Sequence, residues 1–429
     1  MIICKRDDTN MESKITSKTK EYIANGWDKC IRRRTHDDGT LIGLPYPYTV
    51  PGIGHFDEMY YWDTYFTNAG LIASGLELQA KYNVDNMLYM ISRFGYMPNG
   101  NRTYYLGRSL PPFLSQMVRE VYDVIGDNTW LTGAYSALER EHEFWMKNRT
   151  GVTGLATYDA SFPEEDTERY SGQFKSRVQL SPDMIKDIIS LRDMSRHDMA
   201  RHYLAMCESG WDCNPRCEFA MYDYVQIDLN SLLYMLESNM AYFSERLGNG
   251  KAEIWEKRAE TRRALMRKYM RNKDGLYLDY NFVEKKFSPV FSAASFYPLF
   301  AGIADEEEAK AAVSALCRLE AEYGVYACEP GHGVPGVYQW DAPNGWACLQ
   351  YMTVFGLARY GYEGEAKRIA KKYLSLVDKV LEETGGIWEK YNIDDGSINV
   401  KNEYEMPKMM GWSAGVYLAL DGFVNRDKS

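Results

Sequence analysis

Apolar residues recur at spacings of three and four in the segment Asp228-Leu229-Asn230-Ser231-Leu232-Leu233-Tyr234-Met235-Leu236-Glu237-Ser238-Asn239-Met240-Ala241-Tyr242-Phe243. This periodicity is typical of an amphipathic helix. The same pattern recurs along the chain, at about 57–75, 78–94, 112–124, 128–148, 183–207, 251–271, 306–322, 344–361, 364–382 and 409–424. Strand-like alternation is local, as in Gly275 to Tyr280, where we expect a small β-hairpin. The sequence therefore predicts an all-α protein.

Long loops rich in Gly and Pro separate these helices. They run over 43–54, 97–112, 155–177, 324–344 and 394–407. Loops of this length inside a compact domain usually carry function, and their alternation with short connections predicts helical hairpins whose long loops gather on one face. No low-complexity linker divides the chain, so we expect an N-terminal segment with a first helix over 1–40 and one catalytic domain over 41–429.

Composition excludes several functions. The 429 residues carry a net charge of -10, which disfavours binding to nucleic acid phosphates, and no apolar run is long enough to span a membrane. The eight cysteines are irregularly spaced and show no zinc-like pattern, so neither disulfides nor a metal is expected. Met1 to Lys20 lacks the apolar core of a secretory signal. These observations predict a cytoplasmic protein.

Aromatic residues make up 14% of the chain, and flat amphipathic rings suit stacking on sugar rings, although in isolation packing between helices is the more common reason for such rings. Five segments combine such rings with acids and glycines. These are 51–63, 98–109, 208–212, 339–346, and 388–391 followed by 402–404. Their occurrence together favours a carbohydrate site.

The acids in these segments suit the cleavage of a bond between sugars. That reaction needs a proton for the leaving oxygen and, in an inverting enzyme, a carboxylate that activates water on the opposite face. Asp212 directly follows Trp211, and burial beside an apolar ring keeps an acid protonated. Asn99, Arg108 and Gln339 can hydrogen-bond vicinal hydroxyls. Any one of these acids taken alone is better explained as a helix cap or a surface charge, and only the five segments together favour catalysis.

Two motifs resemble those of the trehalase family. The segment 51–66 is similar to the family's Tyr-Tyr-Trp-Asp region, and 339–346 is similar to its Gln-Trp-Asp-x-Pro-x-Gly-Trp motif. The resemblance extends in order from about Pro51 to Leu420, and a match with two Trp in eight residues is specific. It implies an (α/α)6 toroid without a cofactor that hydrolyses a small carbohydrate with inversion.

Roles follow from the same resemblance. Asp212 is similar to the family's general acid and Glu389 to its general base. The expected substrate-binding residues are His55, Trp62, Asp63, Asn99, Arg108, Ser109, Glu164, Gly210, Gln339, Trp340 and Glu403. The leading hypothesis is a glycosidase for trehalose or a similar α-glucoside. Alternatives are the same mechanism on another α-linked disaccharide or a glycosylated small acid, and a sugar-binding protein without catalysis.

Three positions depart from the family pattern. His55 and Phe162 stand where the family usually has Arg, and Leu110 stands where it has Gln. Leu and Phe side chains cannot donate a hydrogen bond, so the sequence predicts an apolar wall and a leaving group that is less polar than that of trehalose or differently linked. Arg102, Arg177 or Lys401 would change this expectation if they reached the site.

Overall fold

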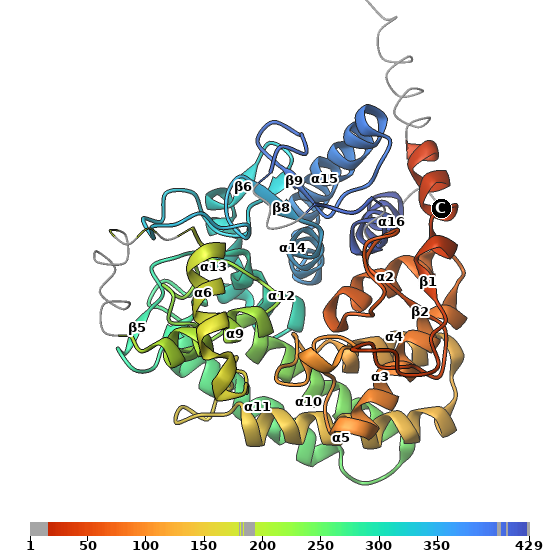
Figure 1. Cartoon of the computed structure of the whole chain (residues 1–429), viewed down its shortest axis with the longest axis horizontal. Coiled ribbons are helices and arrows are strands. Elements are labelled where there is room, and N and C mark those ends of the chain that lie inside the picture. Colours follow the sequence, from red (N-terminus) through yellow and green to blue (C-terminus); the bar gives the residue numbers. More distant parts are fainter. Residues whose placement is uncertain are drawn as a thin grey trace, which may run out of the picture.

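The structure is a computed structural model that describes residues 16–179, 181, 183, 194–400, 405–408 and 411–426. Within this part of the chain, helices enclose a central axis and short strands lie in the connections (Figure 1). No helix in the described ranges is both long and apolar enough to cross a membrane.

Six helices of the described residues form an inner ring in which each contacts the next and the last contacts the first. They are α2 (Tyr61–Ala73), α4 (Leu114–Ile125), α10 (Ile227–Leu247), α12 (Tyr297–Ala301), α14 (Ala347–Arg359) and α16 (Gly411–Asn425). Each of the first five is followed in the chain by an outer helix. These are α3 (Glu77–Phe94), α5 (Asn128–Asn148), α11 (Ala252–Met270), α13 (Glu306–Ala315) and α15 (Glu363–Thr384). The predicted (α/α)6 toroid is confirmed.

The N-terminal helix, residues 16–24, belongs to the outer layer. Thr19 Oγ1 lies 2.5 Å from Asp378 Oδ1 on α15, and Lys20 Nζ lies 2.5 Å from Asp421 Oδ2 on α16. These contacts place this helix against the last hairpin of the ring. It therefore completes the toroid, although it precedes the expected start of the catalytic domain at residue 41.

The burial pattern separates the two rings. Outer helix α15 buries one stripe, consisting of Ala366, Ile369, Ala370, Tyr373, Leu376, Val377 and Val380. Inner helix α10 is surrounded by neighbours and buries most of its residues, including Asp228 and Glu237. Local caps begin some outer helices: the Asp127 side chain accepts hydrogen bonds from Thr129 N and Trp130 N at the start of α5. Amphipathic spacing with a cap is the signal that made these helices predictable.

Close packing of α2 against α16 closes the ring. Gly70 of α2 and Gly415 of α16 face each other, and a Cβ on Gly415 would overlap the Phe66 carbonyl oxygen. Trp27 also lies against Gly70, and its Nε1 donates a hydrogen bond to Ser74 Oγ at 3.1 Å. The first and last inner helices therefore approach at backbone distance because neither has a side chain at the crossing point.

Short strands pair with one another in the connections between helices. The pairs are β1 (Ile31–Arg32) with β2 (Tyr48–Thr49), β6 (Glu320–Ala321) with β7 (Gly324–Val325), and β8 (Asn344–Trp346) with β9 (Lys390–Asn392). A three-stranded sheet joins β3 (Tyr224–Val225), β4 (Tyr280–Asn281) and β5 (Lys286–Phe287). The hairpin expected near Gly275 to Tyr280 is thus found slightly later, as β4 and β5.

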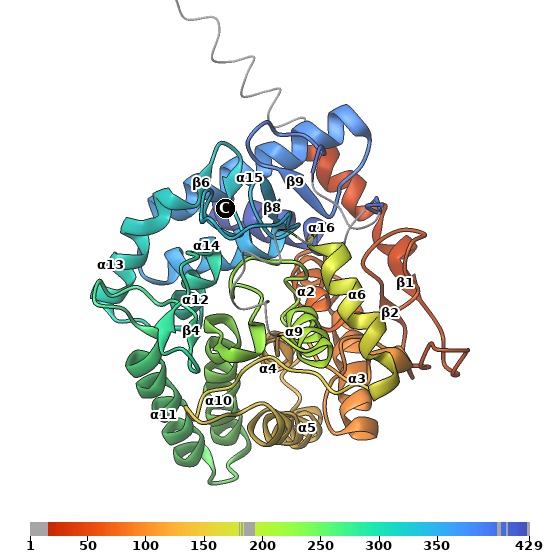
Figure 2. The same cartoon turned by 60° about the vertical axis from the view of Figure 1, so that its left-hand side comes forward.

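One long segment differs from the sequence prediction. Residues 155–177, expected as a loop, contain the 3-10 helix Glu164–Asp166 and helix α6 (Thr167–Arg177). Helix α6 packs beside α9 (Arg196–Glu208) on one face of the ring (Figure 2). It buries only Ser171 and Phe174, too few apolar residues to produce a periodic signal. Part of the expected helix 183–207 lies outside the described residues. Further 3-10 helices are Trp27–Cys30, Thr103–Tyr105, Met221–Asp223, Ala293–Phe296 and Leu316–Arg318.

Candidate active site

A cavity of about 480 Å³ opens on the face that carries α6 and α9. Its wall is built by the start of α2, the loop 97–112, the α6–α9 pair and the loops that precede α10, α14 and α16. Nine of the residues expected from the sequence line it, namely Trp62, Asp63, Asn99, Arg108, Gly210, Asp212, Gln339, Trp340 and Glu389. The toroid thus brings together side chains that are far apart in the sequence.

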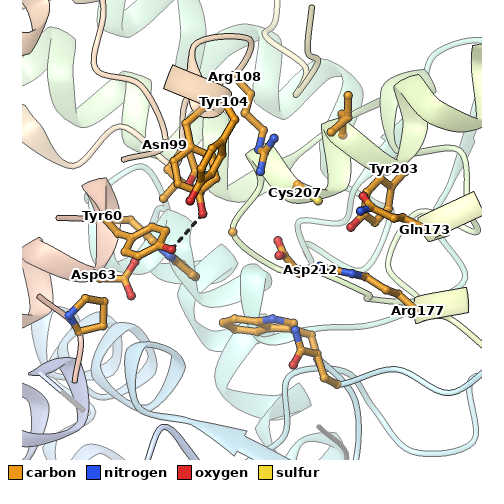
Figure 3. A pocket seen from close by; sticks show the side chains of 18 of the residues that line it. Tyr60, Asp63, Asn99, Tyr104, Arg108, Gln173, Arg177, Tyr203, Cys207 and Asp212 are labelled. Atoms are coloured by element: carbon orange, nitrogen blue, oxygen red, sulfur yellow. Dashed lines mark hydrogen bonds between the residues drawn. The ribbon is translucent and has the colours of Figure 1, made fainter. Parts of the chain in front are cut away.

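Three carboxyl groups share this cavity. Asp63 and Asp212 point into it from different walls (Figure 3), and Glu389 lines it as well. Burial, and after it the negative charges of Glu389 and Asp212, raise the pKa of Asp63 to about 7. Carboxyl groups that share a site with little water cannot all ionise easily. Such a cluster can hold a proton near neutral pH, as acid–base chemistry requires.

A tight turn after α9 presents Asp212. Gly210 has φ +73°, and a Cβ on it would lie 2.7 Å from Trp62 Cε2, so only glycine allows the turn to touch this ring. The buried Trp211 follows, and Asn214 Nδ2 donates a hydrogen bond to Trp211 O at 2.6 Å. The backbone before and after Asp212 is therefore held in place.

The ladder between β8 and β9 presents Glu389. In this ladder Trp346 pairs with Lys390, the residue that follows Glu389. Trp412, at the start of α16, donates from Nε1 to Glu389 O at 3.1 Å. Glu389 is only 2% exposed, although it lines the cavity. Helices α14 and α16 together therefore determine where this carboxylate lies.

Two buried polar atoms on the wall have no hydrogen-bond partner among the described residues: Arg108 Nε and Gln339 Oε1. Arg108 lies over the Tyr105 ring, with its Cζ 5.0 Å from the ring centroid. A buried donor or acceptor left unpaired is costly, and the hydroxyls of a sugar could satisfy both atoms. The cavity therefore presents polar groups of the kind that a carbohydrate needs.

Three expected binding residues do not line the cavity. Ser109 is buried behind it, where its Oγ donates to Met97 O at 2.6 Å and its backbone N donates to Glu208 Oε1 at 2.7 Å. His55 is exposed and packs edge-on against Phe56, which does line the cavity. The Glu164 side chain is 80% exposed and lies 3.7 Å from His197 Nε2. Glu403 lies outside the described residues.

The wall is not the apolar surface expected from the sequence. Leu110 lines the cavity, but Phe162 packs against Tyr170 and His197 outside the lining. Sequence analysis missed α6, which adds Arg169, Tyr170, Gln173 and Arg177 from one helical face. Tyr170, Gln173 and Arg177 are three and four residues apart, and this helical spacing is the signal that could have predicted them. Of the three cations considered as replacements, Arg177 lines the wall, Arg102 pairs instead with Glu58, and Lys401 is not described.

A closed ring of helical hairpins with carboxyl groups and unpaired polar atoms in one cavity defines a glycoside hydrolase of the helical-toroid class. The chain belongs to the trehalase family, because the family model "Trehalase" matches residues 6–424.

Individual relatives agree. A periplasmic trehalase of Xanthomonas campestris is 34% identical over 425 residues, which cover 94% of this chain and 72% of that relative. The structure of neutral trehalase Nth1 from Saccharomyces cerevisiae matches with a TM-score of 0.76 at 29% identity, over 89% of this chain and 74% of the other. A mannosylglycerate hydrolase from Thermus thermophilus matches with a TM-score of 0.63 at 18% identity, over 94% of this chain and 99% of the other, and supports the fold alone.

The expectation of a cytoplasmic protein is wrong by this comparison, because the curated relatives from Xanthomonas are named periplasmic trehalases. A large helical core is stable without disulfides, so cysteine usage does not identify a reducing compartment.

Proposed function

We propose that the protein hydrolyses a small α-glucoside such as trehalose with inversion at the anomeric carbon. Asp212 donates a proton to the glycosidic oxygen, and Glu389 accepts a proton from the water that attacks from the other side. The observation that carries this proposal is the gathering of Asp63, Asp212 and Glu389 in one cavity of a trehalase-family toroid.

The remaining wall supports binding of the sugar in this mechanism. Donors such as Arg108 and acceptors such as Gln339 Oε1 bond hydroxyl groups, while Trp340 and Trp62 provide apolar surface for a ring face. Asp63 enters the same cavity from α2 and contacts the substrate in its protonated or ionised form according to pH.

Helix α6 bears on the identity of the leaving group. Gln173, Arg177 and Tyr203 lie on the side of the cavity that holds Asp212, the proposed proton donor to the leaving oxygen (Figure 3). A leaving group with several hydroxyls, as in trehalose, suits these polar side chains better than an apolar one does. Trehalose is also the substrate that the names of the Xanthomonas and Saccharomyces relatives indicate. Another α-linked disaccharide or a glycosylated small acid is the alternative.

The deciding experiment assays α-linked disaccharides and a glucosylated small acid for released glucose with the wild type, Asp212→Asn and Glu389→Gln. We expect turnover of trehalose and a loss of about 10² to 10⁴ in kcat for each variant, because each removes a proton-transfer step. Both variants should melt like the wild type. Wild-type rates in either variant would exclude that residue from its role, and binding without release of glucose would favour a sugar-binding protein.

Stereochemistry tests the inversion separately. With trehalose, proton NMR of freshly formed product, recorded before mutarotation, should show equal amounts of α- and β-glucose, because the attacked glucose becomes β while the leaving glucose keeps its α configuration. This outcome requires a carboxyl separation of about 6.5 to 9.5 Å between Asp212 and Glu389, which leaves room for a water. Initial product that is α-glucose alone would show retention and refute the proposed roles.

A further inference from the structure

A short hydrogen bond joins two neighbouring side chains at the end of the β8–β9 ladder. Lys390 Nζ lies 2.6 Å from Glu389 Oε2, and the two side chains are 0% and 2% exposed. Because water is largely excluded, the attraction between these charges is far less screened than in a surface pair. Lys390 is therefore part of the immediate surroundings of the proposed base.

A column of indole rings holds Lys390 from the other side. Lys390 Nζ lies 4.6 Å from the centroid of Trp346, which stacks on Trp340 at 3.7 Å with an interplanar angle of 1°. Trp340 in turn stacks on Trp211 at 5.2 Å, and the Arg216 guanidinium lies 4.3 Å from the Trp211 ring. Cations are attracted to ring faces, so a cation covers each end of the column.

The column connects the two proposed catalytic groups. Asp212 directly follows Trp211, at one end of the column, and Glu389 directly precedes Lys390, at the other end. The Arg216 end is anchored by ion pairs of 2.9 Å to Asp228 and 3.0 Å to Asp279, and all three side chains are fully buried. Because the far end cannot shift, the position of the Lys390 ammonium group is determined by rigid neighbours rather than by solvent.

We propose that Lys390 is the positioning residue of the base: it holds the Glu389 carboxyl group in one orientation. The inference depends on the role of Glu389 in the proposed function. Asp63 from α2 and Asp212 from the loop after α9 face the same cavity, and the Cys348 thiol of α14 lies within electrostatic reach of Glu389. The Lys390 ammonium group is the cation in direct contact with the Glu389 carboxyl group.

Two substitutions test the hydrogen bond. Lys390→Met removes the donor, and we expect kcat to fall about 10- to 100-fold with KM little changed, because the side chains that bind the sugar are untouched. Lys390→Gln retains an N–H donor, so it should recover part of kcat. The control is Lys372→Met, which breaks the 2.9 Å pair with Glu320 outside the cavity and should keep the wild-type kcat.

Binding of 1-deoxynojirimycin, a basic sugar analogue, provides a second readout. Calorimetric titration should show the wild-type affinity in the Lys390 variants, because a positioning residue of the base acts on turnover rather than on binding. A folded Lys390→Met protein with the wild-type kcat, or one whose loss lies in KM and in binding of the analogue, would overturn the inference. The proposed function fails separately, if Glu389→Gln hydrolyses substrate at the wild-type rate. An inactive Glu389→Gln with fully active Lys390 variants refutes only the role of Lys390.

Discussion

Asp63 is a carboxyl group whose protonation is coupled to folding. Its pKa is about 7 in the folded protein because of burial and the charges of Glu389 and Asp212, whereas the usual pKa of an aspartate is 3.8. The folded state therefore binds the proton more tightly than the unfolded state, and Asp63 makes stability fall as pH rises from about 4 to 7. The contribution of Asp63 to stability is most unfavourable above its folded pKa.

Asp63→Asn removes this penalty. We expect the variant to be more stable than the wild type at pH 8, by up to about 4 kcal/mol, and the difference to shrink towards pH 4. Urea unfolding of both proteins at several pH values measures this. A stability difference that does not depend on pH would show that Asp63 is not protonated in the folded protein near neutral pH. Asp57→Asn is the control, since the Asp57 side chain is 55% exposed.

The sequence predicted the site residues that belong to motifs, but not those that reach the cavity only because of how a helix is oriented. Trp62, Asp212 and Gln339 stand in motifs, and the structure places all three on the cavity wall. Ser109 stands in a motif too, yet its hydroxyl is used by Met97 O behind the wall. Tyr203 was missed because nothing in its local sequence shows which face of α9 meets the cavity. A motif identifies the neighbourhood of a site, whereas lining depends on helix orientation.

At the scale of elements, predictability followed amphipathicity. Helix α5 was expected over 128–148 and runs over Asn128–Asn148, because an aspartate cap and an apolar stripe define it. Helix α14 was expected to begin at 344, but Asn344–Trp346 pairs with β9 instead. A short, fully buried segment is compatible with either a helix or a strand. Here the pairing with β9, which is distant in the sequence, makes the segment a strand. Helix α6 was missed because its stability comes from its contact with α9.

The polar face of α6 leads to a prediction about substrate affinity. Replacing Gln173 or Arg177 by alanine should raise KM for the best substrate by about 5- to 30-fold, because a hydrogen bond to the leaving group is worth roughly 1 to 2 kcal/mol. Lys175→Ala is the matched control, since Lys175 is exposed on the same helix and does not line the cavity. Steady-state kinetics distinguish the cases. Unchanged KM in both cavity-side variants would remove α6 from leaving-group binding.

For the whole molecule, the closure of the ring determines the geometry of the site. Helix α2 carries Trp62 and Asp63, and α16 carries Trp412, whose indole packs edge-on against Trp62 with centroids 5.8 Å apart. Trp412 also bonds the backbone of Glu389. Since Asp63 and Glu389 are supported by the first and last inner helices, their separation depends on how closely α2 and α16 approach. No local sequence feature encodes this distance.

Gly415→Ala tests this dependence. A Cβ there would overlap the Phe66 carbonyl oxygen, so α16 must move away from α2, and we expect a loss of about 1 to 3 kcal/mol in stability. The same displacement should lower kcat, because Glu389 moves with Trp412 relative to Asp63. Gly422→Ala, on the same helix with no heavy atom within 4 Å of the added Cβ, should retain activity and gain up to about 1 kcal/mol from helix propensity. Thermal melting and steady-state kinetics measure both effects. A Gly415→Ala protein that is destabilised but keeps the wild-type kcat would show that the carboxyl groups are held by their own loops, independently of the contact between α2 and α16.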